Sequence, residues 1–186
     1  MDIAAASIMA FLGFIVLSAG SEKWIHGQEK RARVIADYRV LPASLVKPVA
    51  TTLPLLELGL GLLLLSGVMW QAALPAVFLL MCLFAGGLTV NLVRGRHEIE
   101  CGCFGISTAG RGISWITALR PLALAVAAFA LYVGSETSLF SFSDMTLEVR
   151  LYGWGLASSL LACLVCIQIL LSLTSKSQDD SRGVMA

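Results

Sequence analysis

Uninterrupted apolar runs of about 20 residues recur along the chain, and they constrain its fold more than any other feature. A helix of that length crosses the roughly 30 Å hydrocarbon core of a bilayer and satisfies its own backbone hydrogen bonds. Period-two alternation of polar and apolar residues, which is typical of a transmembrane barrel, is absent. We therefore expect an all-α multi-pass transmembrane helix bundle of about five hydrophobic helices, at residues 3–19, 49–70, 74–93, 113–134 and 151–174.

Composition agrees with this class. Of the 186 residues, 58% are hydrophobic and 13% are charged, whereas a soluble domain is about half apolar and a quarter charged. The formal net charge of +1 gives no bulk field that would recruit nucleic acid. The start, Met1-Asp2, lacks the basic region of a signal peptide, so we expect the first apolar run to be a retained span. Residues 175–186 form a polar tail that we expect to be disordered.

The polar segments between the spans contain prolines that suggest boundaries. Residues 29–38 place charges on one side and apolar residues on the other, which predicts a short helix in the membrane interface. Pro42 and Pro48 are expected to end it, because proline removes a backbone donor and restricts the residue before it. Pro121 is expected at the first turn of the lipid-exposed part of the fourth span.

The sharpest motif is the segment Cys101-Gly102-Cys103-Phe104-Gly105, in the polar loop before the fourth span. Two thiols separated by one residue lie within bonding distance, and Gly102 permits the unusual backbone angles of the small ring that a disulfide would close. A strained, accessible disulfide of this kind is the labile or catalytic type. The motif predicts a redox pair, with Phe104 and Gly105 holding the loop against the bundle and the nearby Arg120 stabilising a thiolate.

Two other interpretations of this loop stay open. The cysteines are incidental if they carry no exchange chemistry. Alternatively, His97 with Cys101 and Cys103 offers imidazole and thiolate ligands suited to zinc or copper(I), although a closed zinc site needs four ligands.

Ionisable and thiol groups also occur inside the spans. Glu57 is a carboxylate in an apolar span, where such groups are costly and face a partner in the bundle interior; we expect Arg120 or His97 to be that partner. Its role is either a proton or quinone site or a structural clamp. Cys163 and Cys166 share one face of the fifth span, either as small buried hydrophobes or as a second redox pair. Cys82 is expected to serve packing.

These residues resemble those of a known family. Lys23-Trp24 after the first span, residues 54–57 (Pro-Leu-Leu-Glu) in the second, the loop of residues 101–105 and the following Arg120 are similar to MauE proteins and to the wider DoxX-like group of redox-associated membrane proteins. The resemblance covers most of the chain. Cys163, Cys166 and Pro121 lie outside its pattern.

The resemblance implies a bacterial inner-membrane protein of methylamine utilisation. MauE proteins are thought to act with MauD, a thioredoxin-like periplasmic protein, in processing, exporting or maturing the small (β) subunit of methylamine dehydrogenase. That subunit carries a tryptophan-derived quinone cofactor and many disulfides. The implied activity is thiol–disulfide exchange; the alternatives are a non-enzymatic docking and assembly partner, and a metal-binding transporter or chaperone.

Basic residues predict the orientation of the spans. They concentrate in the first and third loops, and these residues are Lys23, Lys30, Arg31, Arg33, Arg39, Lys47, Arg94, Arg96 and Arg111. The positive-inside rule makes that side cytoplasmic and puts the N-terminus in the periplasm.

The side of the cysteine loop decides the direction of electron flow. A cytoplasmic cysteine loop would accept reductant and supply a periplasmic isomerase, with Cys163 and Cys166 as a relay. A periplasmic loop, which results if the first or fourth span does not cross fully, would oxidise a MauD-like partner and pass electrons to a quinone.

The charge distribution gives a direct test on a variant with Cys101 as its sole cysteine. A thiol reagent that cannot cross the inner membrane should leave Cys101 unmodified in intact cells and modify it after permeabilisation, because the basic loops face the cytoplasm. Modification in intact cells would instead place the loop in the periplasm and favour the oxidising route.

Overall fold

The computed structural model describes residues 2–25, 27–99, 112–137, 148–149, 151–160 and 162, and its main elements are helices. A further helical stretch lies within residues 148–162. The helices with defined bounds are α1 (Asp2–Ile25), α2 (Gln28–Asp37), α3 (Ala43–Ser66), α4 (Trp70–Val93) and α5 (Trp115–Glu136).

Four of these helices, α1, α3, α4 and α5, are long and apolar enough to cross a membrane. The predicted all-α multi-pass architecture is therefore confirmed for the described part of the chain. α2 matches the predicted interfacial helix within one residue at each end. The predicted fifth span is helical over residues 151–160, and most of its remainder lies outside the described residues, as does the tail.

Several predicted boundaries are wrong, and prolines account for two of them. Pro48 lies inside α3, and Pro121 lies inside α5 and is fully buried. Both stand in the second turn of their helices, where the loss of one backbone hydrogen bond is outweighed by the packing of neighbouring buried residues. α5 begins at Trp115, close to the predicted start of the fourth span at residue 113, where the Ser114 hydroxyl caps the helix by accepting from the Thr117 N–H at 3.3 Å. α1 continues to Ile25, beyond its predicted end at residue 19.

α1 and α3 pack antiparallel, and glycines set how closely they approach. A Cβ added at Gly61 of α3 would lie 2.8 Å from the backbone nitrogen of Leu17 in α1. One added at Gly13 of α1 would lie 3.0 Å from the Leu65 side chain and 3.2 Å from the Gly61 carbonyl oxygen, so the two glycines lie at the same part of the contact. Lipid tails are as apolar as leucine, so membrane helices associate through close packing of this kind rather than through a hydrophobic driving force.

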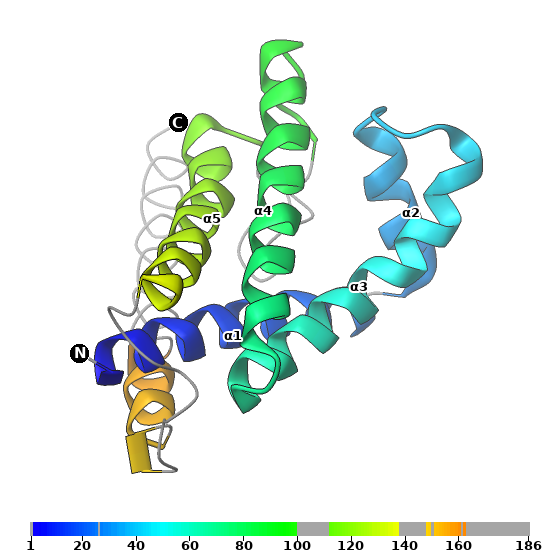
Figure 1. Ribbon diagram of the computed structural model, residues 1–186. Coiled ribbons are helices and arrows are strands. Elements are labelled where there is room, and N and C mark those ends of the chain that lie inside the picture. The colour runs from blue at the N-terminus through cyan, green and yellow to red at the C-terminus, as the bar shows by residue number, and fades with distance from the viewer. Residues whose placement is uncertain are drawn as a thin grey trace, which may run out of the picture.

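α4 and α5 form a second antiparallel pair, which runs steeply across the first in the view of Figure 1. Phe78 of α4 contacts Phe129 of α5 with ring centroids 5.3 Å apart. A short left-handed turn at Gly67 and Met69 joins α3 to α4, so the start of α3 and the end of α4 lie at the same end of the bundle. We call this the loop end, because α1 ends and α5 begins there as well.

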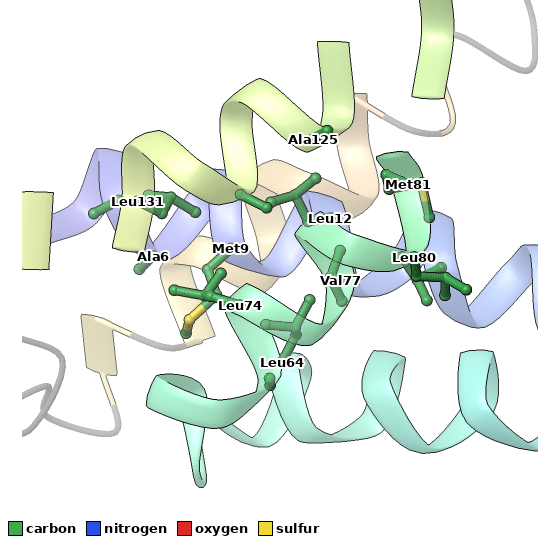
Figure 2. Packing of buried hydrophobic residues seen from close by; sticks show 14 residues of the cluster. Ala6, Met9, Leu12, Leu64, Leu74, Val77, Leu80, Met81, Ala125 and Leu131 are labelled. Carbon is green, nitrogen blue, oxygen red and sulfur yellow. The ribbon is translucent and has the colours of Figure 1, made fainter. Parts of the chain in front are cut away.

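The core lies where the two helix pairs cross. Figure 2 shows side chains from four helices meeting there, all of them buried: Ala6, Met9, Leu12, Leu64, Leu74, Val77, Leu80, Met81, Ala125 and Leu131. The stretch within residues 148–162 packs on this core from outside. A Cβ added at Gly153 would lie 3.1 Å from Ala6, and the Trp154 indole donates to the Leu65 carbonyl at 3.0 Å.

The glycine contact generates a prediction. Gly61→Ala should destabilise the protein by about 1–3 kcal/mol, because its methyl group would press on the α1 backbone. Gly59→Ala is the matched control, since a Cβ at Gly59 of the same helix meets nothing within 4 Å. Unfolding of the two variants in mixed detergent micelles measures the difference. Equal stabilities would contradict the close α1–α3 contact.

Candidate functional site

A buried ion pair joins the first two membrane helices. Lys23, in the last turn of α1, donates from its ammonium Nζ to Oε1 of Glu57, in the middle of α3. The Glu57 residue is fully buried, and the Lys23 side chain is 14% exposed. A carboxylate inside a membrane bundle requires such a partner, because the low-dielectric surroundings do not solvate an isolated charge.

Local sequence makes room for this pair. Gly20 lies one turn before Lys23 on α1, and a Cβ added there would lie 3.0 Å from the Glu57 Cβ and 3.0 Å from the Leu58 nitrogen. The missing side chain lets α3 approach at the level of the carboxylate. Gly20 therefore allows the Glu57 carboxylate to lie close to α1, within reach of the Lys23 ammonium.

Lys23 also contacts the second helix pair. Its ammonium lies 4.8 Å from the ring centroid of Phe84 in α4, within the range of a cation–π interaction. One cation thus links α1 to both α3 and α4. Because both contacts are desolvated, each is stronger than its equivalent at a water-exposed surface.

Arg31 ties the interfacial helix α2 to the same place. Its Nη1 donates to the Lys23 carbonyl at 2.7 Å and to the Trp24 carbonyl at 3.4 Å, and its guanidinium lies 5.7 Å from the Trp24 ring centroid. The last carbonyls of a helix have no partner within that helix and carry partial negative charge, so a cation there is favourable. A second contact, from Gln28 to Thr51 of α3 at 2.9 Å, holds the start of α2.

Two buried oxygens near this end make no hydrogen bond within the described residues. They are Oε2 of Glu57 and Oδ1 of Asn91 in α4. Asn91 is fully buried, and its amide nitrogen donates to the Gly87 carbonyl at 2.9 Å. An unpaired buried acceptor is costly, so it favours a proton or a hydrogen-bond donor from outside the protein. The proton-site and quinone-site interpretations of Glu57 stay predictions.

The partner expected for Glu57 is corrected. It is Lys23, whereas Arg120 is exposed on α5 and His97 is exposed beyond the end of α4. The error follows from ending the first span at residue 19, which left Lys23 in a polar loop. The continuation of α1 to Ile25 places Lys23 inside the bundle, on the same helix face as Gly20. This continuation is the feature that the sequence prediction missed.

The predicted cysteine chemistry falls outside the described residues, which omit Cys101, Gly102, Cys103, Phe104, Gly105, Cys163 and Cys166. Residues 94–114 connect α4 to α5 at the loop end, and the ion pair lies deeper in the bundle, at the middle of α3 and at the level of Phe84 in α4. Within the described residues no group of three metal-ligating side chains occurs, and His97 is the one described member of the alternative metal set. Cys82 is half-buried against the core.

Helices that span a membrane, joined through a buried ion pair, define a multi-pass integral membrane protein. Comparison with known families is more specific. The model of the family "Methylamine utilisation protein MauE" matches residues 1–134, which include all four candidate spans up to Gly134, the ion pair and the cysteine motif. The chain belongs to the MauE family.

Individual relatives agree. The chain is 36% identical to "Methylamine utilization protein MauE" of Methylorubrum extorquens over 67% of its own length and 66% of the relative's. It is 34% identical to the protein of that name from Methylophilus methylotrophus, over 81% and 76% of the two lengths. For Paracoccus denitrificans the values are 32%, 69% and 68%. No solved structure matches the chain.

The ion pair predicts non-additive substitutions. Lys23→Met should destabilise the protein by about 3–5 kcal/mol, because it leaves the Glu57 carboxylate buried without a counter-charge. The double variant Lys23→Met/Glu57→Met removes both charges and should recover most of that loss. The unfolding free energies of the single and double variants give the coupling. Additive losses would contradict a direct pair.

Proposed function

We propose that the chain acts in methylamine utilisation, as a bacterial inner-membrane factor that matures, processes or exports the small subunit of methylamine dehydrogenase. The observation that carries this proposal is the family match over residues 1–134. The names of the relatives, which are methylamine utilization proteins, support the pathway. The four membrane-capable helices support the location in a membrane.

The proposed chemistry is thiol–disulfide exchange at Cys101 and Cys103 with a thioredoxin-fold partner of the MauD kind. The Cys101 thiolate attacks a partner disulfide, and a mixed disulfide forms as a partner thiolate leaves. The Cys103 thiolate then attacks Cys101, closing the Cys101–Cys103 disulfide and releasing the partner as a dithiol. The chain is oxidised by two electrons and the partner is reduced by two. The reverse sequence oxidises the partner.

The described site supports this chemistry by holding the helix ends that carry the loop. α4 and α5 flank residues 94–114, and the Lys23–Phe84 contact ties α4 to the α1–α3 pair. Glu57 and Lys23 are positioning residues in this proposal, since they touch neither sulfur. Arg120, exposed in the second turn of α5, is the proposed cation for the thiolate.

Serine substitutions test the exchange step. Cys101→Ser and Cys103→Ser should each abolish accumulation of the mature dehydrogenase subunit, because either change removes the exchanging pair. Cys103→Ser should also trap a mixed disulfide through Cys101, which is visible on non-reducing gels. Cys82→Ser is the matched control, since Cys82 packs against the core, and it should leave maturation intact.

The outcomes separate the alternatives. Normal subunit disulfides in the double serine variant would reject exchange and favour a non-enzymatic docking partner. Metal that copurifies with the protein and is lost on replacing Cys101 and Cys103 would favour the metal-binding alternative. Each variant is compared at equal amounts of membrane-inserted protein, so that a folding defect is not mistaken for lost chemistry.

A further inference from the structure

Three of the exposed cations at the loop end flank the start of α3 and the end of α4. Arg39 lies between α2 and α3, Lys47 lies in the second turn of α3, and Arg94 follows the last residue of α4. The antiparallel path of α3 and α4 brings them to one end. At the opposite end, the α3–α4 turn of residues 67–69 carries no charge, and the last residue of α5 is Glu136.

These cations differ from the other basic residues nearby. On the outward side of α2, Arg33 lies 3.9 Å from Glu29, and the formal charges of Lys30 and Asp37 offset each other. Arg39, Lys47 and Arg94 form no ion pair with any side chain in the described ranges. Lys30, Arg96 and Arg120 likewise form no ion pair with a described side chain, whereas Arg39, Lys47 and Arg94 are the exposed cations that flank the start of α3 and the end of α4.

The neighbours of these cations are exposed and aliphatic. Val40 and Leu41 follow Arg39 at 53% and 37% exposure, Leu45 near Lys47 is 46% exposed, and Val93 beside Arg94 is 74% exposed. Aliphatic side chains next to cations suit the boundary between acyl chains and headgroups, where the apolar part enters the bilayer and the charge meets phosphate. An acidic soluble protein would match the charges and leave the aliphatic groups in water.

We propose that Arg39, Lys47 and Arg94 form a binding rim for the phosphate groups of anionic phospholipids in the leaflet at the loop end. Anionic lipid attracts basic residues near the membrane surface, and the three sites surround the ends of α3 and α4. The rim is independent of the cysteine chemistry, and it would enrich anionic lipid around the loop of residues 94–114.

Native tryptophans provide the test. Trp24 ends α1 and Trp115 starts α5, so both report on the loop end, whereas Trp70 starts α4 at the other end and Trp154 contacts Leu65 there. A Trp70→Phe/Trp154→Phe protein in phosphatidylcholine nanodiscs carries reporters only at the loop end. Brominated phosphatidylglycerol at a low mole fraction should quench it at least about twofold more than the same fraction of brominated phosphatidylcholine.

Replacing Arg39, Lys47 and Arg94 with glutamine should lower this preference strongly, and high salt should abolish it. Replacing Arg39 and Arg94 with lysine should retain it, because the charge is kept. The Trp24→Phe/Trp115→Phe protein, which reports on the opposite end, should show no preference.

Equal quenching by the two lipids at the loop end, or an equal preference at both ends, would overturn the proposal. So would a preference that the glutamine substitutions leave unchanged. If the glutamine variant shows no change in lipid quenching but loses subunit maturation, an acidic protein partner replaces lipid as the ligand of the rim, and the lipid proposal fails while the proposed function stands.

Discussion

The buried pair of Lys23 and Glu57 fixes the arrangement on which the other contacts depend. In a bilayer two apolar helices can slide or rotate against each other at little cost, because lipid replaces every contact that is lost. A desolvated charge allows no such freedom, since moving either partner leaves a charge in a low-dielectric medium. The pair therefore defines the register of α1 against α3, and Gly20 and Gly61 permit the close approach that this register requires.

The same cation extends this register to the rest of the bundle. Lys23 meets Phe84 of α4, and its own carbonyl accepts from Arg31 of α2. Contacts with one turn at the end of α1 therefore hold α2, α3 and α4 in place. The segment that carries the cysteines begins after α4, so its starting point depends on this cluster. In the proposed exchange reaction, a fixed starting point would help the cysteine pair meet its partner, because orientation is provided before the encounter.

Sequence reasoning recovered the features that depend on length and composition. The spans follow from apolar runs, because the bilayer thickness sets a length that few soluble helices share. It failed where tertiary contacts override local preference. Pro48 suggests a helix boundary and Pro121 the start of a lipid-exposed part, yet Pro48 lies inside α3 among buried neighbours and Pro121 is itself buried in α5. The sequence predicts that Glu57 needs a partner in the bundle. It does not predict which residue this is, because Lys23 is 34 residues away in sequence and lies in the part of α1 beyond its predicted end.

A count of basic residues treats them as equivalent, although they make different contacts in the structure. Lys23 is taken up by the core and Arg31 by the end of α1, while Arg33 lies beside Glu29. None of the three is fully available to a membrane surface, although each counts equally in the positive-inside rule. Lys30, Arg39 and Lys47 remain in the first loop, together with Arg94 and Arg96 in the third. The excess of basic residues from which the orientation is predicted therefore persists after the structural cations are subtracted, because these residues form no ion pair within the described part of the chain.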